Sequence, residues 1–259
     1  MRQYTVMDIE CNDQHENEDI FSHEILGPLY KNLEAGKLIK TGCNASQTDG
    51  QESYVEVLAK QLALDPYHPY LTISKKFKTP VKYVKKELNW YLSESLSIKG
   101  YVDDVATWKE CCTKDDKMEV NSNYGWCVFS EANGSQYDNC LKVLSADKTS
   151  RNGIIIYNRP SIYKDYKRDG CHDMICTFFS HFLIRDNTLQ MVHVMRSNDA
   201  RFGFMSDFPW SCFVYQNMYA DLKKVYPELK TGKIYWTSDS MHLYSRHYDD
   251  LKEYAKELV

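Results

Sequence analysis

The sequence contains no uninterrupted apolar segment of about 18 residues, the length that a membrane-spanning helix needs. Its first residues, MRQYTVMDIECNDQHENED, also lack the basic and then apolar order of a secretory signal peptide. These two absences lead us to expect a cytoplasmic protein that does not bind a membrane.

An excess of positive charge is absent as well. The chain has 32 lysine and arginine residues against 36 aspartate and glutamate residues, for a formal net charge of −4. Surfaces that bind nucleic acid usually need a clear positive excess, because they displace counterions from the phosphate backbone. Direct nucleic-acid binding is therefore not expected, although a small acidic ligand could bind through a local basic cluster.

The nine cysteines are an odd number and show no Cys-x-x-Cys spacing, so they predict neither a zinc site nor a disulfide framework. Internal repeats, low-complexity tracts and long Pro/Gly/Ser linkers are also missing. The 43% of hydrophobic and 26% of charged residues lie close to globular averages. We expect one large folded domain without a metal, in which residues 41–53 are the least structured part.

Helical patterns occur in four parts of the chain. Residues 79–95 place apolar side chains at helical intervals, with Thr79 as a plausible N-cap and Pro80 at the first helical position. A second helix is expected to begin at Ser135 and a third at Asp207, the latter continuing to residue 226. Residues 18–37 also have helical spacing, interrupted at Gly27 and Pro28.

Strand-like segments gather in the second half of the chain. They are residues 153–157, 174–184, 189–195 and 233–236, preceded by one earlier strand at 54–64. Residues 185–188, with the sequence RDNT, are typical of a turn and predict a hairpin between the second and third of these segments. The order of the elements predicts an α+β fold.

Cys176 lies within one of the β-rich segments, between Ile175 and Thr177. A cysteine in such a setting is more often a packing residue than a nucleophile. A nucleophilic thiol needs a nearby positive charge that favours its thiolate. Arg196, on the strand expected to pair with that of Cys176, is a candidate for this charge.

Other polar residues near the strands have both a functional and a structural interpretation. Arg196 and Ser197 are suited to holding the oxygens of a phosphate, but Arg196 could instead form a surface salt bridge with Asp199. Asp207 stands before Phe208 and Pro209, where a carboxylate commonly caps a helix.

His242 and Tyr244 are two residues apart, so on an extended segment they project to the same face. They could also be partly buried polar aromatics. Glu87 lies beside Leu88 on the first predicted helix, where a glutamate is either half-buried or solvated.

Seven stretches occur in the order KELNWYLSES, EVNSNYGW, SQYDNCL, GIIIYNRPS, DMICT, MRSNDARFGF and SMHLYSRH, between about residues 80 and 247. In this order they resemble the thymidylate synthase family, and within it the phage deoxycytidylate hydroxymethylases. The resemblance implies one catalytic domain over residues 1–259 with a divergent part at 1–50. It also implies a mostly antiparallel or mixed sheet packed with helices, and a homodimer formed through the sheet.

The resemblance also implies roles for single residues in the reacting centre. Cys176 matches the nucleophile that adds to C6 of a pyrimidine, so that C5 can attack the methylene carbon of 5,10-methylenetetrahydrofolate. Tyr124 and Glu87 match groups that manage protons and ordered water, with Glu87 as the activator of the water that becomes the product hydroxyl.

Further roles concern the binding of the two substrates. Arg196 and Ser197 match the phosphate grip, and a second copy of the chain would add Arg151 across the dimer interface. His242 and Tyr244 match the pair that binds the sugar hydroxyl. The folate contacts are matched by Asp199 and Trp108.

Asp207 occupies the position at which thymidylate synthases carry asparagine. An asparagine amide can donate to O4 and accept from N3–H of uracil. Cytosine presents the reverse edge, because its N4 amino group donates and its N3 accepts until it is protonated. A carboxylate accepts from N4 and favours a proton on N3, so Asp207 is expected to select cytosine.

The chain departs from the family pattern in three places. Asn152 replaces the second of two adjacent arginines, a loss for which Lys148 or Arg159 could compensate. His181 stands where relatives have glutamine, which predicts a changed polar contact behind the nucleophile. The chain ends 12 residues after His247, so we expect folate to be held more loosely or by another segment, such as the first forty residues. A short tail would also admit water.

We therefore expect a homodimeric, folate-dependent dCMP hydroxymethyltransferase that works in a bacterial host's cytoplasm and makes a precursor of modified phage DNA. Alternatives within the fold are a dUMP hydroxymethylase, a thymidylate synthase and a CMP hydroxymethylase. Two alternatives of other kinds are a catalytically silent nucleotide-binding homologue and a single-strand binder that uses the 14% of aromatic residues for stacking.

Overall fold

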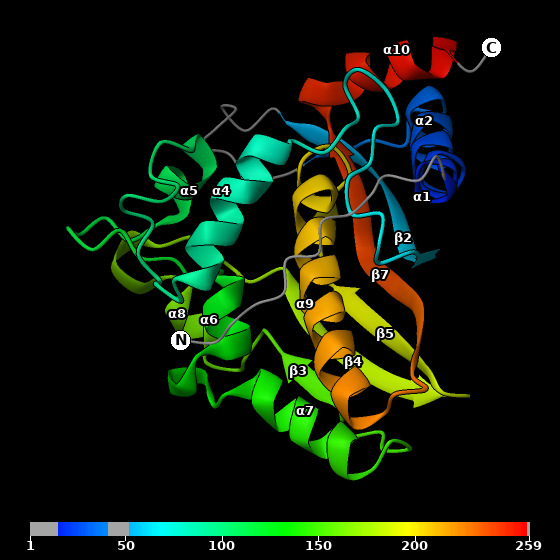
Figure 1. The fold of residues 1–259 in the computed structure, drawn as a ribbon. Coiled ribbons are helices and arrows are strands. Elements are labelled where there is room, and N and C mark those ends of the chain that lie inside the picture. Colours follow the sequence, from blue (N-terminus) through cyan, green and yellow to red (C-terminus); the bar gives the residue numbers. More distant parts are fainter. Residues whose placement is uncertain (1–14, 41–51, 258–259) are drawn as a thin grey trace.

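A seven-stranded mixed sheet forms the centre of the computed structural model, which describes residues 15–40 and 52–257 (Figure 1). The strand order is β1-β2-β7-β5-β4-β3, and β6 pairs with β7. Most neighbours are antiparallel, whereas β5 and β6 run parallel to β7. The strands are β1 (Ile39–Lys40), β2 (Ser53–Leu64), β3 (Ile154–Ile156), β4 (Thr177–Arg185), β5 (Thr188–Met195), β6 (Asn198–Asp199) and β7 (Lys230–Tyr244).

The expected hairpin is confirmed: β4 and β5 pair antiparallel from Thr177 opposite Met195 to Arg185 opposite Thr188. Asp186 and Asn187 form the turn with positive φ angles of 49° and 55°. Asp and Asn adopt this left-handed conformation more readily than other non-glycine residues, which is why they favour two-residue hairpin turns. The expected loop at residues 41–53 lies almost wholly outside the described residues.

The last strand is much longer than the predicted segment at 233–236. β7 extends from Lys230 to Tyr244 and pairs with both β2 and β5. Its polar residues, such as Thr237 and Asp239, obscured the strand pattern, although they alternate with buried ones such as Trp236 and Ser238. His242 and Tyr244 therefore lie on an extended segment, as their spacing requires.

The helices are α1 (Glu16–Phe21), α2 (Gly27–Glu34), α4 (Val81–Leu92), α5 (Ala106–Cys111), α6 (Tyr124–Phe129), α7 (Gln136–Ala146), α8 (Ile162–Asp165), α9 (Gly203–Val225) and α10 (Tyr248–Glu257). The four predicted helical regions correspond to α1–α2, α4, α7 and α9, although their starts differ from the predicted ones, whereas α5, α6 and α8 were not predicted. Thr79 does not cap α4, because its hydroxyl accepts a hydrogen bond from Leu71 N–H at 3.0 Å instead.

Two other expectations about helices are wrong. Asp207 is not the N-cap of α9, which begins at Gly203 and places Asp207 in its second turn. Gly27 and Pro28 do not break the N-terminal helix either. A short π-helical turn, Ser22–Leu26, joins α1 to α2 directly before Pro28, and its altered hydrogen-bond pattern accommodates the missing N–H of the proline.

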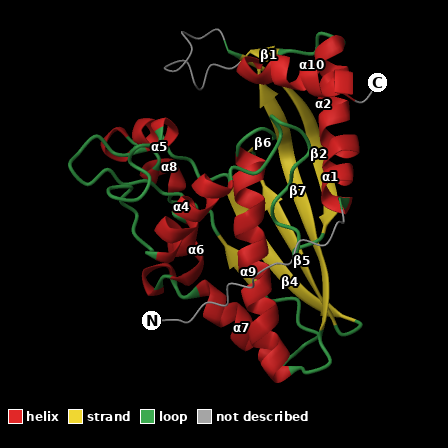
Figure 2. Ribbon diagram, turned by 45° about the horizontal axis from the view of Figure 1, so that its top comes forward, coloured by secondary structure: helices red, strands yellow, loops and turns green. Residues whose placement is uncertain are grey.

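The helices cover one face of the sheet. Figures 1 and 2 show α4, α6, α7 and α9 on the same side, and the ring of Phe21 from α1 stacks on Phe204 of α9 at 4.3 Å. On the other face, apolar side chains are exposed to solvent: Leu58 is 68% exposed, Ile154 39% and Ile156 48%. This uncovered apolar face belongs to β2, β3, β4 and their neighbours.

Candidate functional site

The Cys176 thiol lies beside the guanidinium of Arg196 at the end of the β4–β5 ladder. Backbone N–H of Arg196 donates to the carbonyl of Cys176 at 2.9 Å. The guanidinium donates to the carbonyls of Met174 at 2.7 Å and Ile175 at 3.1 Å, and its Nη2 lies 3.5 Å from Sγ of Cys176. Among the ion pairs of the described residues, none joins Arg196 to Asp199, so the alternative of a surface salt bridge is wrong.

Burial sets the protonation of this thiol. It raises the pKa of Cys176 to about 11; the positive charge of Arg196 opposes the rise, and the negative charges of Asp207 and Asp173 add to it. Without a ligand the thiol is therefore mostly protonated at neutral pH. Arg196 can therefore stabilise the thiolate once it forms, although the thiol of Cys176 is protonated in the free enzyme.

Asp173 connects the segment before Cys176 to the segment before α6. Its buried carboxylate accepts hydrogen bonds from the backbone N–H groups of Asn121 and Ser122, both at 2.6 Å, and from the Ser122 hydroxyl at 2.7 Å. No pattern in the sequence marks this residue as part of the site. Asp173 lies in the stretch DMICT, but the sequence does not show which backbone N–H groups will donate hydrogen bonds to its carboxylate.

Tyr124 begins α6, whose N-cap Asn123 accepts a hydrogen bond from the backbone of Trp126. The Tyr124 ring is buried and stacks on Tyr91 with 5.4 Å between the ring centres. Burial, followed by the negative charges of Asp207 and Cys176, raises the pKa of Tyr124 well above its ordinary value. The phenol therefore stays protonated and can donate a hydrogen bond.

Glu87 is buried on α4 and ends a chain of hydrogen bonds. Trp108 Nε1 donates to the Tyr83 hydroxyl at 2.8 Å, which in turn donates to Oε1 of Glu87 at 2.7 Å. Burial raises the pKa of Glu87 to about 7, with the hydrogen bonds from Tyr83, Tyr91 and Trp108 opposing the rise. A carboxyl with this pKa can both give and take a proton near neutral pH. Tyr83 was missed, although its place four residues before Glu87 on a helix makes the two side chains neighbours.

Asp207 faces the same centre from α9. Asn198 Nδ2 donates to its Oδ2 at 3.1 Å. Burial, followed by the negative charges of Glu87 and Asp199, raises the pKa of Asp207 well above its ordinary value, and the Asn198 hydrogen bond opposes this. Because Asp207 acts electrostatically on Tyr124 and Cys176 as well, the structure brings these predicted residues together.

The pair His242 and Tyr244 lies next to Asp199, because β6 pairs with β7 at Asp199 opposite His242. Nδ1 of His242 donates to the carbonyl of Ser240 at 3.2 Å, and burial lowers the pKa of His242. The ring is thus neutral, and its Nε2 is an acceptor. The guanidinium of Arg246, which the sequence analysis missed, lies 4.3 Å from the centre of the Tyr244 ring.

Arg151 and Asn152 are exposed and lie away from Cys176 in the same subunit. They precede β3, which pairs antiparallel with β4 at Ile154 opposite His181, five residues beyond Cys176. His181 does not support the nucleophile from behind. Its Nε2 donates to the backbone carbonyl of Arg151 at 3.0 Å.

The two basic residues that could replace the missing arginine form contacts within the subunit, although Nη1 of Arg159 has no hydrogen-bond partner among the described residues. Lys148 donates to Asn187 at 3.1 Å, at the end of β4 opposite to Cys176. Arg159 pairs with Asp165 at 2.9 Å. Ser197 is half-buried directly after Arg196.

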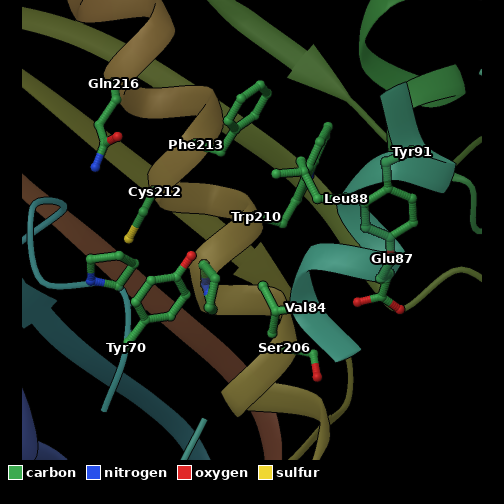
Figure 3. A pocket seen from close by; sticks show the side chains of 12 residues that line it. Tyr70, Val84, Glu87, Leu88, Tyr91, Ser206, Trp210, Cys212, Phe213 and Gln216 are labelled. Atoms are coloured by element: carbon green, nitrogen blue, oxygen red, sulfur yellow. The ribbon is translucent and has the colours of Figure 1, made fainter. Parts of the chain in front are cut away.

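A cavity of about 70 Å³ separates α4 from α9, and Glu87 and Ser206 lie on its wall (Figure 3). Pro69 and the exposed Tyr70 also line it. The volume has room for several water molecules. Water can therefore come close to Glu87 between the two helices.

Comparison with known proteins agrees with this arrangement. The family model described as thymidylate synthase matches residues 30–257. The chain belongs to the thymidylate synthase family. It is similar to the deoxycytidylate 5-hydroxymethyltransferases of enterobacteria phages T6 and T4, with 42% identity over 170 residues, 64% of this chain and 68% of each relative. The fold is similar to that of thermostable thymidylate synthase A from Bacillus subtilis, with a TM-score of 0.67, 19% identity and coverage of 91% of this chain and 84% of the other.

Membership of the thymidylate synthase family confirms the resemblance on which the site residues were chosen and the α+β fold. It identifies the chain as a folate-dependent enzyme that transfers a one-carbon group to a pyrimidine nucleotide. Within residues 15–40 and 52–257, no helix is long and apolar enough to cross a membrane.

Proposed function

We propose that this enzyme is a dCMP hydroxymethyltransferase, which converts dCMP, 5,10-methylenetetrahydrofolate and water into 5-hydroxymethyl-dCMP and tetrahydrofolate. The observation that carries the proposal is the carboxyl group of Asp207, held in the same centre as Cys176, Tyr124 and Glu87. The 42% identity to phage enzymes named for deoxycytidylate supports it.

Asp207 matches the edge of cytosine in both charge and hydrogen bonding. Because burial raises its pKa, the carboxyl can carry a proton in the free enzyme and give that proton to N3 of the base. The resulting carboxylate accepts hydrogen bonds from N3–H and from the N4 amino group. Uracil already carries a proton on N3, so it cannot take the proton that Asp207 gives to cytosine, and its carbonyl oxygen at C4 would meet the ionised carboxylate with mismatched partners.

Cys176 supplies the nucleophile. Its thiolate adds to C6 of the ring, the electron pair of the C5–C6 double bond moves toward C5 and N3, and the proton from Asp207 neutralises the charge that develops there. Arg196 favours the thiolate from 3.5 Å and offers the remaining part of its guanidinium to the nucleotide phosphate, with Ser197 beside it.

The residues that would hold folate lie at the start of α9 and beside α4. Asp199 offers a half-buried carboxylate acceptor, Phe202 a ring that is 47% exposed, and Trp108 a half-buried indole. An acidic acceptor between flat apolar surfaces fits a heterocycle that carries N–H groups. When bound, the folate supplies the methylene carbon to which C5 becomes joined.

Glu87 completes the reaction by activating water. C5 first loses its proton, and the bond between the new carbon and tetrahydrofolate breaks, so that an exocyclic methylene group remains on the ring. The carboxylate of Glu87 then takes a proton from a water molecule whose oxygen bonds to this carbon, and the proton on N3 returns to Asp207. The electrons return through the ring, and the thiolate of Cys176 leaves C6, so that the C5–C6 double bond is restored. A carboxyl group with a pKa of about 7, at the wall of a cavity that has room for water molecules, suits this step.

The sugar and the phosphate would be held by residues of two subunits. The neutral His242 accepts from the sugar hydroxyl through Nε2, with Tyr244 beside it. Arg151 would reach the phosphate from the partner copy, since it lies far from Cys176 in its own subunit. A homodimer formed through the uncovered apolar face of the sheet would also bury Leu58, Ile154 and Ile156. The product would serve as a precursor of modified phage DNA.

Tritium release from C5 tests this proposal. Wild-type enzyme, methylenetetrahydrofolate and either [5-³H]dCMP or [5-³H]dUMP are incubated in parallel, and the products are separated chromatographically. We expect release from dCMP together with 5-hydroxymethyl-dCMP. Faster release from dUMP would disprove the base assignment, formation of a methylated product would indicate a synthase, and release from neither would indicate a silent homologue. [5-³H]CMP in a third tube tests the ribonucleotide alternative.

A further inference from the structure

Asn198 is a buried asparagine with one satisfied and one unsatisfied end. Only 2% of the residue is exposed. Its Nδ2 donates to Oδ2 of Asp207 at 3.1 Å, whereas its Oδ1 is buried without a hydrogen-bond partner. A buried polar oxygen without a partner destabilises the folded state, so the presence of such an atom calls for an explanation.

The backbone around Asn198 is arranged to bring the amide and the carboxyl together. β6 is only two residues long and is held by parallel pairing to β7, with Asn198 opposite Met241. Gly203 opens α9 directly beside the contact. A Cβ atom at Gly203 would stand 3.3 Å from Nδ2 of Asn198 and 3.7 Å from Oδ2 of Asp207. The glycine therefore leaves the space that the two side chains fill.

We propose that Asn198 is a positioning residue that holds Asp207 in both of its protonation states while Asp207 exchanges a proton with N3 of the base. The inference rests on the proposed function and concerns how the same site recognises cytosine. A primary amide is the neutral side chain that both donates and accepts at nearly the same place. With Asp207 ionised, Nδ2 donates to Oδ2, as the structure shows.

With Asp207 protonated, a half-turn of the amide exchanges Nδ2 for the unpartnered Oδ1, which then accepts the proton on Oδ2. The carboxyl thus keeps the same neighbour before and after it gives its proton to the pyrimidine. When dCMP binds, a half-turn of the carboxyl about its Cβ–Cγ bond brings the protonated oxygen to N3, and the amide turns back so that Nδ2 donates to the other carboxyl oxygen, the contact that the structure shows. Asn198 adds no charge of its own, so the proton is shared only between Asp207 and N3.

Several titratable groups face Asp207 and contribute to its environment. The acids and the thiol are Glu87 from α4, Asp199 from β6 and Cys176 from the segment before β4. The phenols are Tyr83 and Tyr91 from α4, Tyr124 from α6 and Tyr157 from the segment after β3. None of these groups forms a hydrogen bond with the Asp207 carboxyl, and among the described residues the side chain that donates to it is that of Asn198.

Calorimetric binding of two ligands tests the inference without requiring turnover. One ligand is dCMP and the other is 2-deoxyribose 5-phosphate, which keeps the sugar and phosphate but has no base. The variants are Asn198→Leu, which has the same shape without the amide, and Asn198→Ser, whose hydroxyl can still donate and accept. Asn217→Leu serves as the control for loss of a buried asparagine, because Asn217 lies ten residues beyond Asp207 on α9 and donates to Phe213.

We expect Asn198→Leu to weaken dCMP binding about 10- to 100-fold, the usual range for a hydrogen bond to a charged group. Binding of 2-deoxyribose 5-phosphate should stay unchanged in every variant, Asn198→Ser should recover part of the loss, and Asn217→Leu should bind dCMP as the wild type does. In the wild type the affinity for dCMP should fall as the pH rises above the pKa of Asp207, and Asn198→Leu should move this fall to higher pH. The Asp207→Asn variant should not show this decrease in dCMP affinity with pH, which would assign the decrease to the Asp207 carboxyl.

Unchanged dCMP binding in Asn198→Leu would overturn the inference, while a wild type that prefers dCMP to dUMP would leave the proposed function standing. Equal weakening of the binding of dCMP and 2-deoxyribose 5-phosphate would also overturn the inference. It would indicate that β6 had lost its structure and had disturbed His242 and the sugar site. A wild type that binds dUMP more tightly would overturn both proposals. Should Asn198→Leu fail to fold, Asn198→Ser gives the same comparison with a smaller change.

Discussion

Nη2 of Arg196 lies 3.5 Å from Sγ of Cys176, and the same guanidinium is fixed by the carbonyls of Met174 and Ile175. The segment that carries the thiol therefore also orients the cation that stabilises the thiolate. Because an arginine offers five N–H donors, part of the guanidinium remains for the oxygens of a phosphate. One side chain can thus couple occupancy of the phosphate site to the reactivity of the thiol.

Replacing Cys176 by alanine should abolish tritium release from [5-³H]dCMP, because no other side chain in the site can add to C6. Cys176→Ser should lower the rate by at least about 1,000-fold, since a serine hydroxyl is far less acidic than a thiol. Cys140→Ala provides a matched control, because Cys140 is buried on α7 outside the site. Release by Cys176→Ala at the control rate would rule out Cys176 as the nucleophile.

Replacing Arg196 by methionine should raise the pKa of Cys176 further above about 11, because the opposing positive charge is lost. Alkylation of Cys176 by iodoacetamide, followed by mass spectrometry across pH 7 to 11, measures this. At each pH the variant should react more slowly than the wild type, and its curve should lie at higher pH. A curve at lower pH would show that Arg196 does not stabilise the thiolate.

Asp207→Asn should shift the preference from dCMP toward dUMP, since the amide donates to O4 of uracil and accepts from its N3–H. A mismatch between buried polar partners costs on the order of 1–3 kcal/mol, so the ratio of kcat/KM values should change by about 10- to 100-fold or more. Tritium release from both nucleotides gives the ratio. If the variant still prefers dCMP by the wild-type factor, the base is recognised by other residues.

The presence of the main helices and strands was predicted better than their boundaries, and the reason is physical. Apolar periodicity predicted the β4–β5 hairpin and α4, but it could not show that α9 begins at Gly203, because backbone pairing of β6 with β7 decides where the chain turns into the helix. Cys176, Arg196 and Asp207 belong to stretches that resemble the family, so they could be proposed as site residues from the sequence, and the structure places the three near one another.

The supporting residues were not visible in the same way. Asp173 and Asn198 act through contacts with residues that are distant in sequence or with backbone groups, such as Asn121 N–H. No local pattern shows that a carboxylate will accept hydrogen bonds from the backbone N–H groups of a particular loop. An asparagine beside an aspartate is also common on protein surfaces. Only the packed fold shows that these two side chains are buried and which atoms they contact.

Asp173→Asn should destabilise the protein and slow the reaction together. The amide nitrogen of the new side chain would face donors from Asn121 or Ser122, leaving at least one of them unsatisfied at a cost of about 1–3 kcal/mol. The segments that carry Tyr124 and Cys176 would also lose their connection. Urea unfolding gives the loss of stability, and tritium release gives the loss of rate. A fully active variant with wild-type stability would contradict the connecting role.

Burial raises the pKa of the Asp173 carboxyl in the folded state, so its ionisation works against folding. For an acid whose folded pKa is raised, the favourable contribution is complete below the unfolded pKa and is lost as the pH rises through the folded pKa. The difference in unfolding free energy between wild type and Asp173→Asn should therefore become smaller as the pH rises through that value. Urea titrations at a series of pH values measure this trend, and a difference that grows with pH would contradict it.

An inactive variant and a variant that binds dCMP weakly should together restore activity at low dCMP concentration when their subunits are combined. In the proposed dimer each site uses Cys176 of one subunit and Arg151 of the other. A heterodimer of Cys176→Ala and Arg151→Ala subunits has one site with both residues intact and one with neither. Random pairing makes half of the dimers mixed, so activity should reach about a quarter of the wild-type value.

The experiment needs the two variants to be refolded together from urea, with each refolded alone as a control. Separately, Cys176→Ala should be inactive and Arg151→Ala should show a raised KM for dCMP, because only the phosphate contact is lost. The mixture should regain turnover with the wild-type KM, which identifies the restored sites as complete ones. Because Arg151 lies beyond His181 along the β3–β4 ladder, it cannot reach Cys176 of its own chain. A mixture that shows only the averaged activity of its two components would therefore mean that the phosphate is bound without the second subunit.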